Sequence, residues 1–259
     1  KKGNVYVTGQ SWNGTDYDYA TIKYSPTGEI LWTKRYNGQV NGEDHAQALT
    51  VDDSGNIYVT GSSQVIGADE YYTTIKYSFT GDTLWIGRYK PSAGLFARAF
   101  ALAVDYSGNV YVTGYSVLIG SSDDYFTVKY SSTGDTLWTR RYNGPGNEID
   151  RPKDLAVDDS GNVYVTGFSW SDTTFDDCTT IKYSSTGDQI WLNRYNGSGT
   201  GNDAGEALAV DNAGNVYVIG SIAETSGSDN IWIGKFNSSL VLAASVTING
   251  SGNSSDYGN

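Results

Sequence analysis

The chain has 259 residues, 38% of them hydrophobic, which is enough for a packed core and excludes a disordered chain. Its formal net charge of −12 makes nucleic acid an unfavourable partner, because an acidic surface repels phosphate backbones. No stretch approaches the roughly 20 apolar residues that a membrane helix needs, so we predict no membrane span. Glycine is abundant (32) and proline scarce (4), which is typical of short strands joined by turns.

A repeat runs through the whole chain. The string GN[VI]YV recurs at spacings of 52, 53, 53 and 53 residues, beginning at Gly3, Gly55, Gly108, Gly161 and Gly214. A lysine followed by an aromatic residue keeps the same step, at Lys23, Lys76, Lys129, Lys182 and Lys235. A tryptophan recurs at Trp32, Trp85, Trp138 and Trp191, and the fifth copy has Ala244 there. Such self-similarity indicates a repeat architecture.

Each repeat contains four short runs, which we call A to D in chain order. In the third repeat they are Ala101–Asp105 (A), Val110–Gly114 (B), Thr127–Ser131 (C) and Leu137–Asn143 (D). An Asp-x-[Ser/Ala]-Gly-Asn turn joins A to B, and a Ser-x-Thr-Gly-[Asp/Glu] turn joins C to D in most copies. Glycine supplies the positive φ that a tight hairpin requires. The first copy lacks run A, so the chain holds four A runs and five each of B, C and D.

The runs are rich in Val, Ile, Thr, Tyr and Trp and alternate with period two, and no window shows a helical period. Four antiparallel strands per unit match a propeller blade better than a linear solenoid, which usually has shorter repeats. We therefore predict an all-β, single-domain propeller over residues 1–259, with five four-stranded blades of about 53 residues. The approximate repeat bounds are 1–44, 45–97, 98–150, 151–203 and 204–259.

The ends leave ring closure open. The chain opens with Lys1-Lys2-Gly3, contains no methionine, and stops where a further run A would begin. A closed ring of five blades would then have an unpaired strand edge, which is costly. We expect a segment of a longer protein or larger propeller, or closure by the residues at the two ends.

These motifs resemble the bacterial β-propeller repeat family often called the SBBP repeat. Its hallmark is a run similar to ALAVDxSGNVYVTG followed by a TxKYxxxG hairpin, and the second, third and fourth copies match along nearly the whole unit. The fifth copy diverges after Lys235. The Thr-Gly-[Asp/Glu]-x-x-Trp turn also resembles the tryptophan-docking motif of quinoprotein-type propellers. Members of the repeat family are mostly secreted or cell-surface bacterial proteins without assigned catalytic residues, so the resemblance implies a fold and a compartment but no active site.

Reactive side chains are few, and we predict that the chain is not an enzyme. His45 is the single histidine, and its counterparts in the other repeats are Arg98, Arg151 and Ala204, which indicates a loop side chain and not a catalytic base. Cys178, the single cysteine, occupies a position held elsewhere by Tyr or Ile and is expected to be semi-buried and inert. An enzyme with a site in the central channel is the alternative, but the A runs offer few titratable groups.

The loops between runs B and C carry acids and tryptophans at positions where the repeats differ. Hard oxygen ligands gathered on one face suit Ca²⁺, but these acids lack the ordered ligand run of a calcium loop, so we predict no metal and no cofactor and keep Ca²⁺ as an alternative. The acids of the Asp-x-Ser-Gly-Asn turns are expected to cap their own turns. The candidate ligand-binding residues are Trp12, Asp16, Asp18, Asp69, Asp123, Asp124, Trp170, Asp176, Asp177 and Asp229.

The Lys of run C and the Arg of run D recur in mid-strand, where a buried cation needs a partner. We hypothesise that each pairs with a turn aspartate of its own or a neighbouring repeat. Lysines that protect exposed strand edges are the alternative.

Residues that repeat serve the fold, whereas the variable loops on a rigid scaffold are where recognition usually resides. We therefore predict a non-enzymatic extracellular or cell-surface module that binds a protein or cell-surface component through its loops. The alternative is a lectin-like propeller that stacks a glycan on Trp12, Trp170 and Trp232 beside loop acids.

Overall fold

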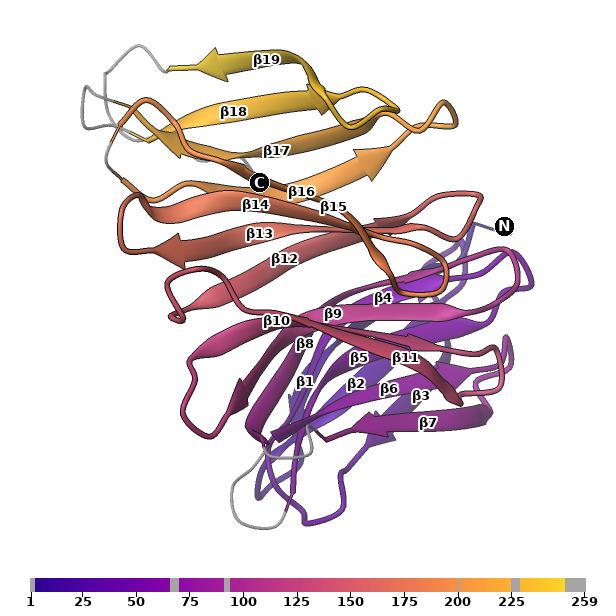
Figure 1. Ribbon diagram of the computed structural model, residues 1–259. Helices are drawn as coiled ribbons and strands as arrows, with labels where there is room; N and C mark the ends of the chain where they lie inside the picture. The colour runs from indigo at the N-terminus through magenta and orange to yellow at the C-terminus, as the bar shows by residue number, and fades with distance from the viewer. Residues whose placement is uncertain (1–2, 66–69, 91–93, 200, 225–228, 250–259) are drawn as a thin grey trace. The chain divides into compact units, whose positions relative to one another are not determined.

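The computed structural model describes residues 3–65, 70–90, 94–199, 201–224 and 229–249. Over these residues the chain forms nineteen β-strands and no helix, which confirms the all-β prediction (Figure 1). The predicted ligand residue Asp69 lies outside the described residues.

The chain divides into two compact units, one of Lys1–Ile119 with Lys129–Leu137 and one of Gly120–Val128 with Trp138–Asn259. The boundary runs through the third repeat, whose strands are β8 (Gly94–Val104), β9 (Val110–Leu118), β10 (Asp123–Tyr130) and β11 (Thr136–Tyr142). The single domain stays a prediction.

The first unit begins with a three-stranded sheet in the order β1-β2-β3. The second repeat has four strands, with β5 between β4 and β6 and with β7 on the other side of β6. A single parallel pair, Glu70 with Phe96, joins β6 to β8. The strand bounds are β1 (Val5–Trp12), β2 (Tyr17–Tyr24), β3 (Ile30–Tyr36), β4 (Asp44–Val51), β5 (Ile57–Gln64), β6 (Glu70–Tyr77) and β7 (Thr83–Tyr89).

The second unit holds two four-stranded antiparallel sheets, in the orders β12-β13-β14-β15 and β16-β17-β18-β19. The strand bounds are β12 (Asp150–Val157), β13 (Val163–Ser171), β14 (Phe175–Tyr183), β15 (Gln189–Tyr195), β16 (Ala204–Val210), β17 (Val216–Ala223), β18 (Asp229–Phe236) and β19 (Leu242–Ile248). Runs A to D therefore become neighbouring strands in sequence order. The sheets are open, and the first has three strands, so five four-stranded blades are not established.

The conformation of the hairpin turn between runs A and B follows from its sequence. In the fourth repeat the Asp158 carboxylate accepts hydrogen bonds from the Asn162 backbone N–H at 2.9 Å and from the Asn162 side chain at 2.8 Å. Gly161 lies at φ 76°, a conformation that glycine adopts without steric cost. The same bonds recur in the turns that begin at Asp52, Asp105 and Asp211, so these aspartates cap their own turns as the sequence predicts.

A β-bulge lies directly before each run A, opposite the glycine of run B. In the fourth repeat the register shifts between Pro152 and Asp154, and a Cβ placed on Gly167 would lie 2.1 Å from the Arg151 carbonyl oxygen. The bulge presses the two backbones together, so glycine is the residue that fits.

Sheets of consecutive repeats pack through the tryptophan of run D. In the first unit Trp85 Nε1 donates a hydrogen bond to the Ser132 carbonyl at 3.1 Å, and in the second unit Trp138 Nε1 donates to the Ser185 carbonyl at 3.1 Å. Both acceptors lie in the C–D turn of the next repeat. The cores lie between sheets, and the one in the second unit includes Val218, Trp232 and Phe236.

The run-C lysine of the second repeat, Lys76, departs from the hypothesis. Lys76 Nζ donates to the Ser132 carbonyl at 3.2 Å and lies 5.1 Å from the centre of the Tyr58 ring, in place of an ion pair with a turn aspartate. The Tyr58 hydroxyl donates to Asp52 at 3.0 Å. Tyr58 therefore lies between the lysine and the turn aspartate and contacts both. A cation–π contact takes the place of the predicted salt bridge.

Candidate functional site

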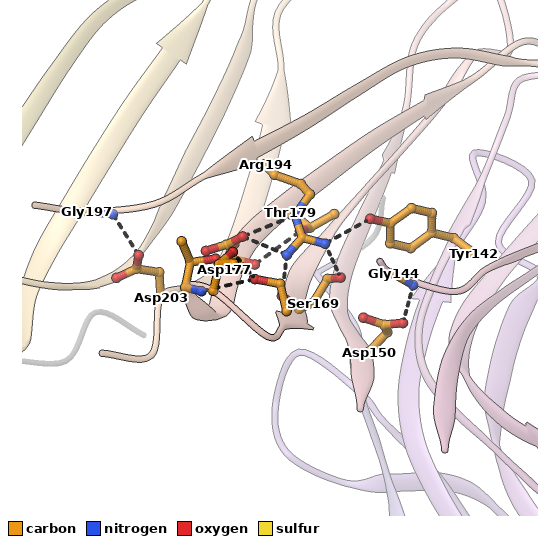
Figure 2. A network of polar contacts seen from close by, with 12 residues as sticks. Tyr142, Gly144, Asp150, Ser169, Asp177, Thr179, Arg194, Gly197 and Asp203 are labelled. Carbon is orange, nitrogen blue, oxygen red and sulfur yellow. Dashed lines mark hydrogen bonds and ion pairs between the residues drawn. The ribbon is translucent and has the colours of Figure 1, made fainter. Parts of the chain in front are cut away.

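A buried polar network lies at one end of the β12–β15 sheet, where strands β13 and β14 are joined (Figure 2). Arg194 from β15 lies 2.6 Å from the Asp177 carboxylate through its Nη2, and the same atom donates to the Ser169 carbonyl at 3.0 Å. Its Nη1 donates to the Ser169 hydroxyl at 2.9 Å and to the Tyr142 hydroxyl at 3.4 Å. Asp177 is buried and the Arg194 side chain is 18% exposed, so this pair is a largely covered structural contact.

The same pair recurs in two other repeats, so three of the run-D arginines pair with an aspartate, but not with the turn aspartate of the hypothesis. Arg35 lies 3.4 Å from Asp18, and Arg141 pairs with Asp124. The partners are acids of the B–C loop, not of the hairpin turns. Three predicted ligand residues (Asp18, Asp124 and Asp177) are therefore buried and already bonded to arginine.

A second buried carboxylate stands four residues before run A at three places, Asp44, Asp150 and Asp203. Its Oδ2 accepts a backbone N–H from the D–A connection that precedes it, from Gly144 to Asp150 and from Gly197 to Asp203 at 2.7 Å. Burial raises the pKa of all three acids, and it raises the pKa of Asp203 to about 6. These acids anchor the connection, and sequence analysis did not single them out although they recur in register.

A cleft of about 510 Å³ opens beside this network, in the second unit. Its walls come from the D–A connection, run A and the B–C loop of the fourth repeat, with Asn202 from the connection that follows. The lining residues are Glu148, Ile149, Arg151, Phe168, Trp170, Phe175, Asp176 and Asn202. Of the ten predicted ligand residues, the cleft brings together Trp170 and Asp176.

Phe175 is the strained member of the cleft wall. Its backbone lies at φ 64°, in the left-handed region that bulky residues avoid, and its side chain is 51% exposed. A large aromatic ring held in this conformation with little burial to compensate is typical of a functional position. Sequence analysis missed Phe175 and Phe168. The available signal was variation between repeats, because an aromatic residue is not present at these positions in all of them. For example, Gln10 and Ser62 stand at the counterparts of Phe168.

The remaining predicted ligand residues lie elsewhere. Trp12 is 54% exposed and packs edge-on against Tyr17 at 5.2 Å between ring centres. Asp16 is buried and accepts a hydrogen bond from Asn13, and Asp123 pairs with Arg151. Asp229 begins β18 and is half-buried.

Trp232 does not offer a ring to a glycan. It is fully buried and stacks on Tyr195 with ring centres 4.4 Å apart. It lies in strand β18 and fills the core of the second unit, so the expectation that its ring stacks on a glycan is wrong.

Cys178 and His45 have bland environments. Cys178 is buried, and burial raises the pKa of its thiol to about 12, which leaves too little thiolate for nucleophilic chemistry. His45 Nδ1 hydrogen-bonds the Gln10 side chain, and its Nε2 lies 3.7 Å from the Glu43 carboxylate. Within the described ranges no three His, Cys, Asp or Glu side chains gather as metal ligands would.

The described part of the chain likewise holds no helix of the length and hydropathy that crossing a membrane requires.

Comparison with known proteins agrees with this architecture. The chain is 26% identical over 164 residues to an uncharacterized WD repeat-containing protein of Acanthamoeba polyphaga mimivirus. The aligned segment covers 57% of this chain and 11% of that protein. Its fold is similar to that of a lignostilbene dioxygenase from Pseudomonas brassicacearum, with a TM-score of 0.53, 12% identity, and coverage of 95% and 64% of the two chains. It is also similar to a protein of unknown function from Dyadobacter fermentans, with a TM-score of 0.52, 11% identity, and coverage of 99% and 82%.

The similarity to solved structures extends to the fold alone at these identities. Residues 31–67 and 137–172 match the family model described as beta-propeller repeat, SBBP. The first segment spans run D of the first repeat and runs A and B of the second. The second segment spans run D of the third repeat and runs A and B of the fourth, and these runs form strands of the sheets described above. These two segments of the chain therefore match the beta-propeller repeat of the SBBP family.

Proposed function

We propose that this chain is a non-enzymatic, extracellular or cell-surface binding module, in which the repeats are blades of a propeller of five or more blades. The loops between runs B and C present the binding surface, and no cofactor takes part. A beta-propeller repeat fold favours a binding or scaffold role, since the recurring side chains are consumed by packing, turn capping and ion pairs within the sheets.

The observation that carries this proposal is the cleft beside Trp170. It combines aromatic walls with a carboxylate (Asp176) and an amide (Asn202), which is the composition of a site that binds by stacking and a few oriented polar contacts. It lies at the variable end of the β12–β15 sheet, beside the ion pair of Asp177 with Arg194. The protein or cell-surface component that we predict as partner would enter here.

Two observations argue against catalysis. The Cys178 thiol is buried with a raised pKa, and the acids Asp18, Asp124 and Asp177 are paired with arginine. A general acid or base must reach a substrate proton, and these four groups are buried.

A glycan is the second candidate ligand. Trp12 presents a half-exposed ring and Trp170 lines the cleft, and sugar rings stack on such surfaces. The two tryptophans occupy the same position of the repeat, three residues after the glycine of run B. This favours a lectin-like use of the same loops.

The test compares the parent chain with Trp170→Ala in two assays, capture of surface-labelled proteins from intact cells and binding to a glycan array. Tyr106→Ala is the matched control, because Tyr106 is an exposed aromatic in an A–B turn. We expect a captured protein, or a glycan in the lectin case, to be lost with Trp170→Ala and kept with Tyr106→Ala. Equal binding by all three chains, or no ligand for the parent in either assay, would refute the proposal.

A further inference from the structure

A ladder of side chains joins consecutive repeats at the B–C loop end of the strands. The residue four positions before run C in one repeat is matched with the residue three positions before run A in the next, and both positions recur every 53 residues. The four steps can therefore be compared directly. They are Tyr17 with His45, Glu70 with Arg98, Asp123 with Arg151, and Asp176 with Ala204.

The second and third steps are ion pairs. Arg98 Nη2 lies 2.6 Å from Glu70 Oε1, and Arg151 Nε pairs with Asp123 Oδ2. The two acid side chains are 12% and 14% exposed, whereas the two arginine side chains are 44% and 42% exposed. The guanidinium thus covers a buried carboxylate from the solvent side. The first step needs no ion pair because Tyr17 is neutral, and its ring lies 6.5 Å from that of His45.

The fourth step keeps the acid and loses the arginine. Ala204 stands where the earlier steps have Arg98 and Arg151. The Asp176 backbone carbonyl still accepts the Asp203 N–H at 2.7 Å, so the two strands approach as in the other steps. Within the part of the chain that the structure describes, no cation pairs with the Asp176 carboxylate. Burial, with the carboxylates of Asp150 and Asp177, raises the pKa of Asp176, as expected for an acid without its cation.

The Asp176 side of this unfilled step faces the cleft. Asp176 lines it together with the rings of Phe168, Trp170 and Phe175. A guanidinium stacks on aromatic faces and pairs with a carboxylate in one plane, so this wall matches both of its preferences. Arg151 also lines the cleft, but its charge is already matched by Asp123.

We propose that this cleft binds an arginine side chain of a partner protein, whose guanidinium takes at Asp176 the place that Arg98 and Arg151 take within the chain. The proposal rests on the binding function above and names the chemistry of its ligand. The net charge of −12 supports it, since an acidic surface attracts a basic partner.

The probe is N-acetyl-arginine methylamide, with the neutral citrulline analogue as its match in shape. Binding is followed by NMR on the ¹⁵N-labelled chain through the indole N–H signal of Trp170, which is assigned by its loss in Trp170→Phe. We expect the arginine probe to shift this signal with a saturable dependence and the citrulline probe to bind at least about tenfold more weakly, as a lost charge-assisted contact implies.

Three variants locate the contact. Asp176→Asn removes the carboxylate charge, and Ala204→Arg supplies the missing arginine within the chain, so both should abolish the shift. Asp172→Asn changes an exposed acid of the same loop that does not line the cleft, and it should bind the arginine probe like the parent. The far-ultraviolet circular dichroism and melting temperature of each variant establish that it is folded.

The outcomes separate this inference from the proposed function. Equal binding of the citrulline probe, or unchanged arginine binding by Asp176→Asn or Ala204→Arg, would overturn the arginine assignment. If no arginine probe binds but a cell-surface partner is still lost with Trp170→Ala, the assignment is wrong and the binding function stands. If that partner is lost with Ala204→Arg as well, both are supported.

Discussion

Asp177 Oδ2 and Arg194 Nη2 lie 2.6 Å apart, with the carboxylate buried and the arginine largely covered (Figure 2). The sequence couples the two positions. The first, third and fourth repeats have Asp with Arg, whereas the fifth has Asn230 with Thr247. In the fifth repeat, which lacks the arginine, the neutral residue Asn230 stands in place of the aspartate. This agrees with the high cost of burying an unpaired charge.

Removing Arg194 should therefore destabilise the fold strongly. We expect Arg194→Met to lower the free energy of unfolding by about 3–5 kcal/mol, because Asp177 would be left buried and uncompensated. The matched control is Arg88→Met in the second repeat, where Tyr71 replaces the aspartate and Arg88 is exposed, so a loss below about 1 kcal/mol is expected. Urea unfolding of both variants measures the difference, and equal losses would contradict the assignment.

The glycine of run B provides a second matched pair. A Cβ on Gly167 would lie 2.1 Å from a backbone carbonyl oxygen, whereas a Cβ on Gly9 meets nothing within 4 Å, because the first sheet lacks run A. We expect Gly167→Ala to cost roughly 3 kcal/mol or more and Gly9→Ala to change stability by less than about 0.5 kcal/mol. Thermal melts of the two variants are the measurement. A large loss with Gly9→Ala would place a strand against β1.

The repeat made the sheets predictable. The 53-residue step, the period-two alternation and the glycine turns place all nineteen strands, since these signals are local and recur. Ring closure was not predictable from the repeat, because it depends on a run A that the first copy lacks.

The site was predictable only in part. Composition marked the loop acids but did not separate Asp177, which is buried against Arg194, from its neighbour Asp176, which lines a cleft. Adjacent residues of a strand point to opposite faces, and which face is covered depends on the next repeat. Phe175 was missed because what distinguishes it is a positive φ angle, which a phenylalanine in the sequence does not predict.

Phe175 allows a test of backbone strain. In the left-handed region alanine is strained by roughly 1–2 kcal/mol whereas glycine is not. We expect Phe175→Gly to be more stable than Phe175→Ala by about that amount, the reverse of the usual order of these residues in a strand. Both variants remove the ring from the cleft and should weaken ligand binding equally. Urea unfolding tests the order, and an alanine variant as stable as the glycine variant would show that the angle stores no strain.

Cys178 should be silent in the native protein. Burial raises its pKa to about 12, so at pH 8 a thiol reagent should react roughly 10³-fold or more slowly with the folded chain than with the chain in denaturant. Release of the chromophore from a disulfide reagent measures both rates. Rapid labelling of one thiol per native chain would mean that the second unit opens around Cys178.

Asp203 should make stability depend on pH. Its pKa is about 6 in the folded chain, above the value of 3.8 for an exposed aspartate, so the folded state holds the proton more tightly than the unfolded state. Stability contributed by this group is therefore present below pH 4 and is lost as the pH rises through 6. Asp203→Asn removes the titration while keeping an acceptor for the Gly197 N–H. Relative to this variant, the melting temperature of the parent should rise as the pH falls from 7 to 4. A difference between the two chains that stays constant over that range would show that Asp203 is ionised in the folded protein at pH 4, and that its burial is offset by a partner.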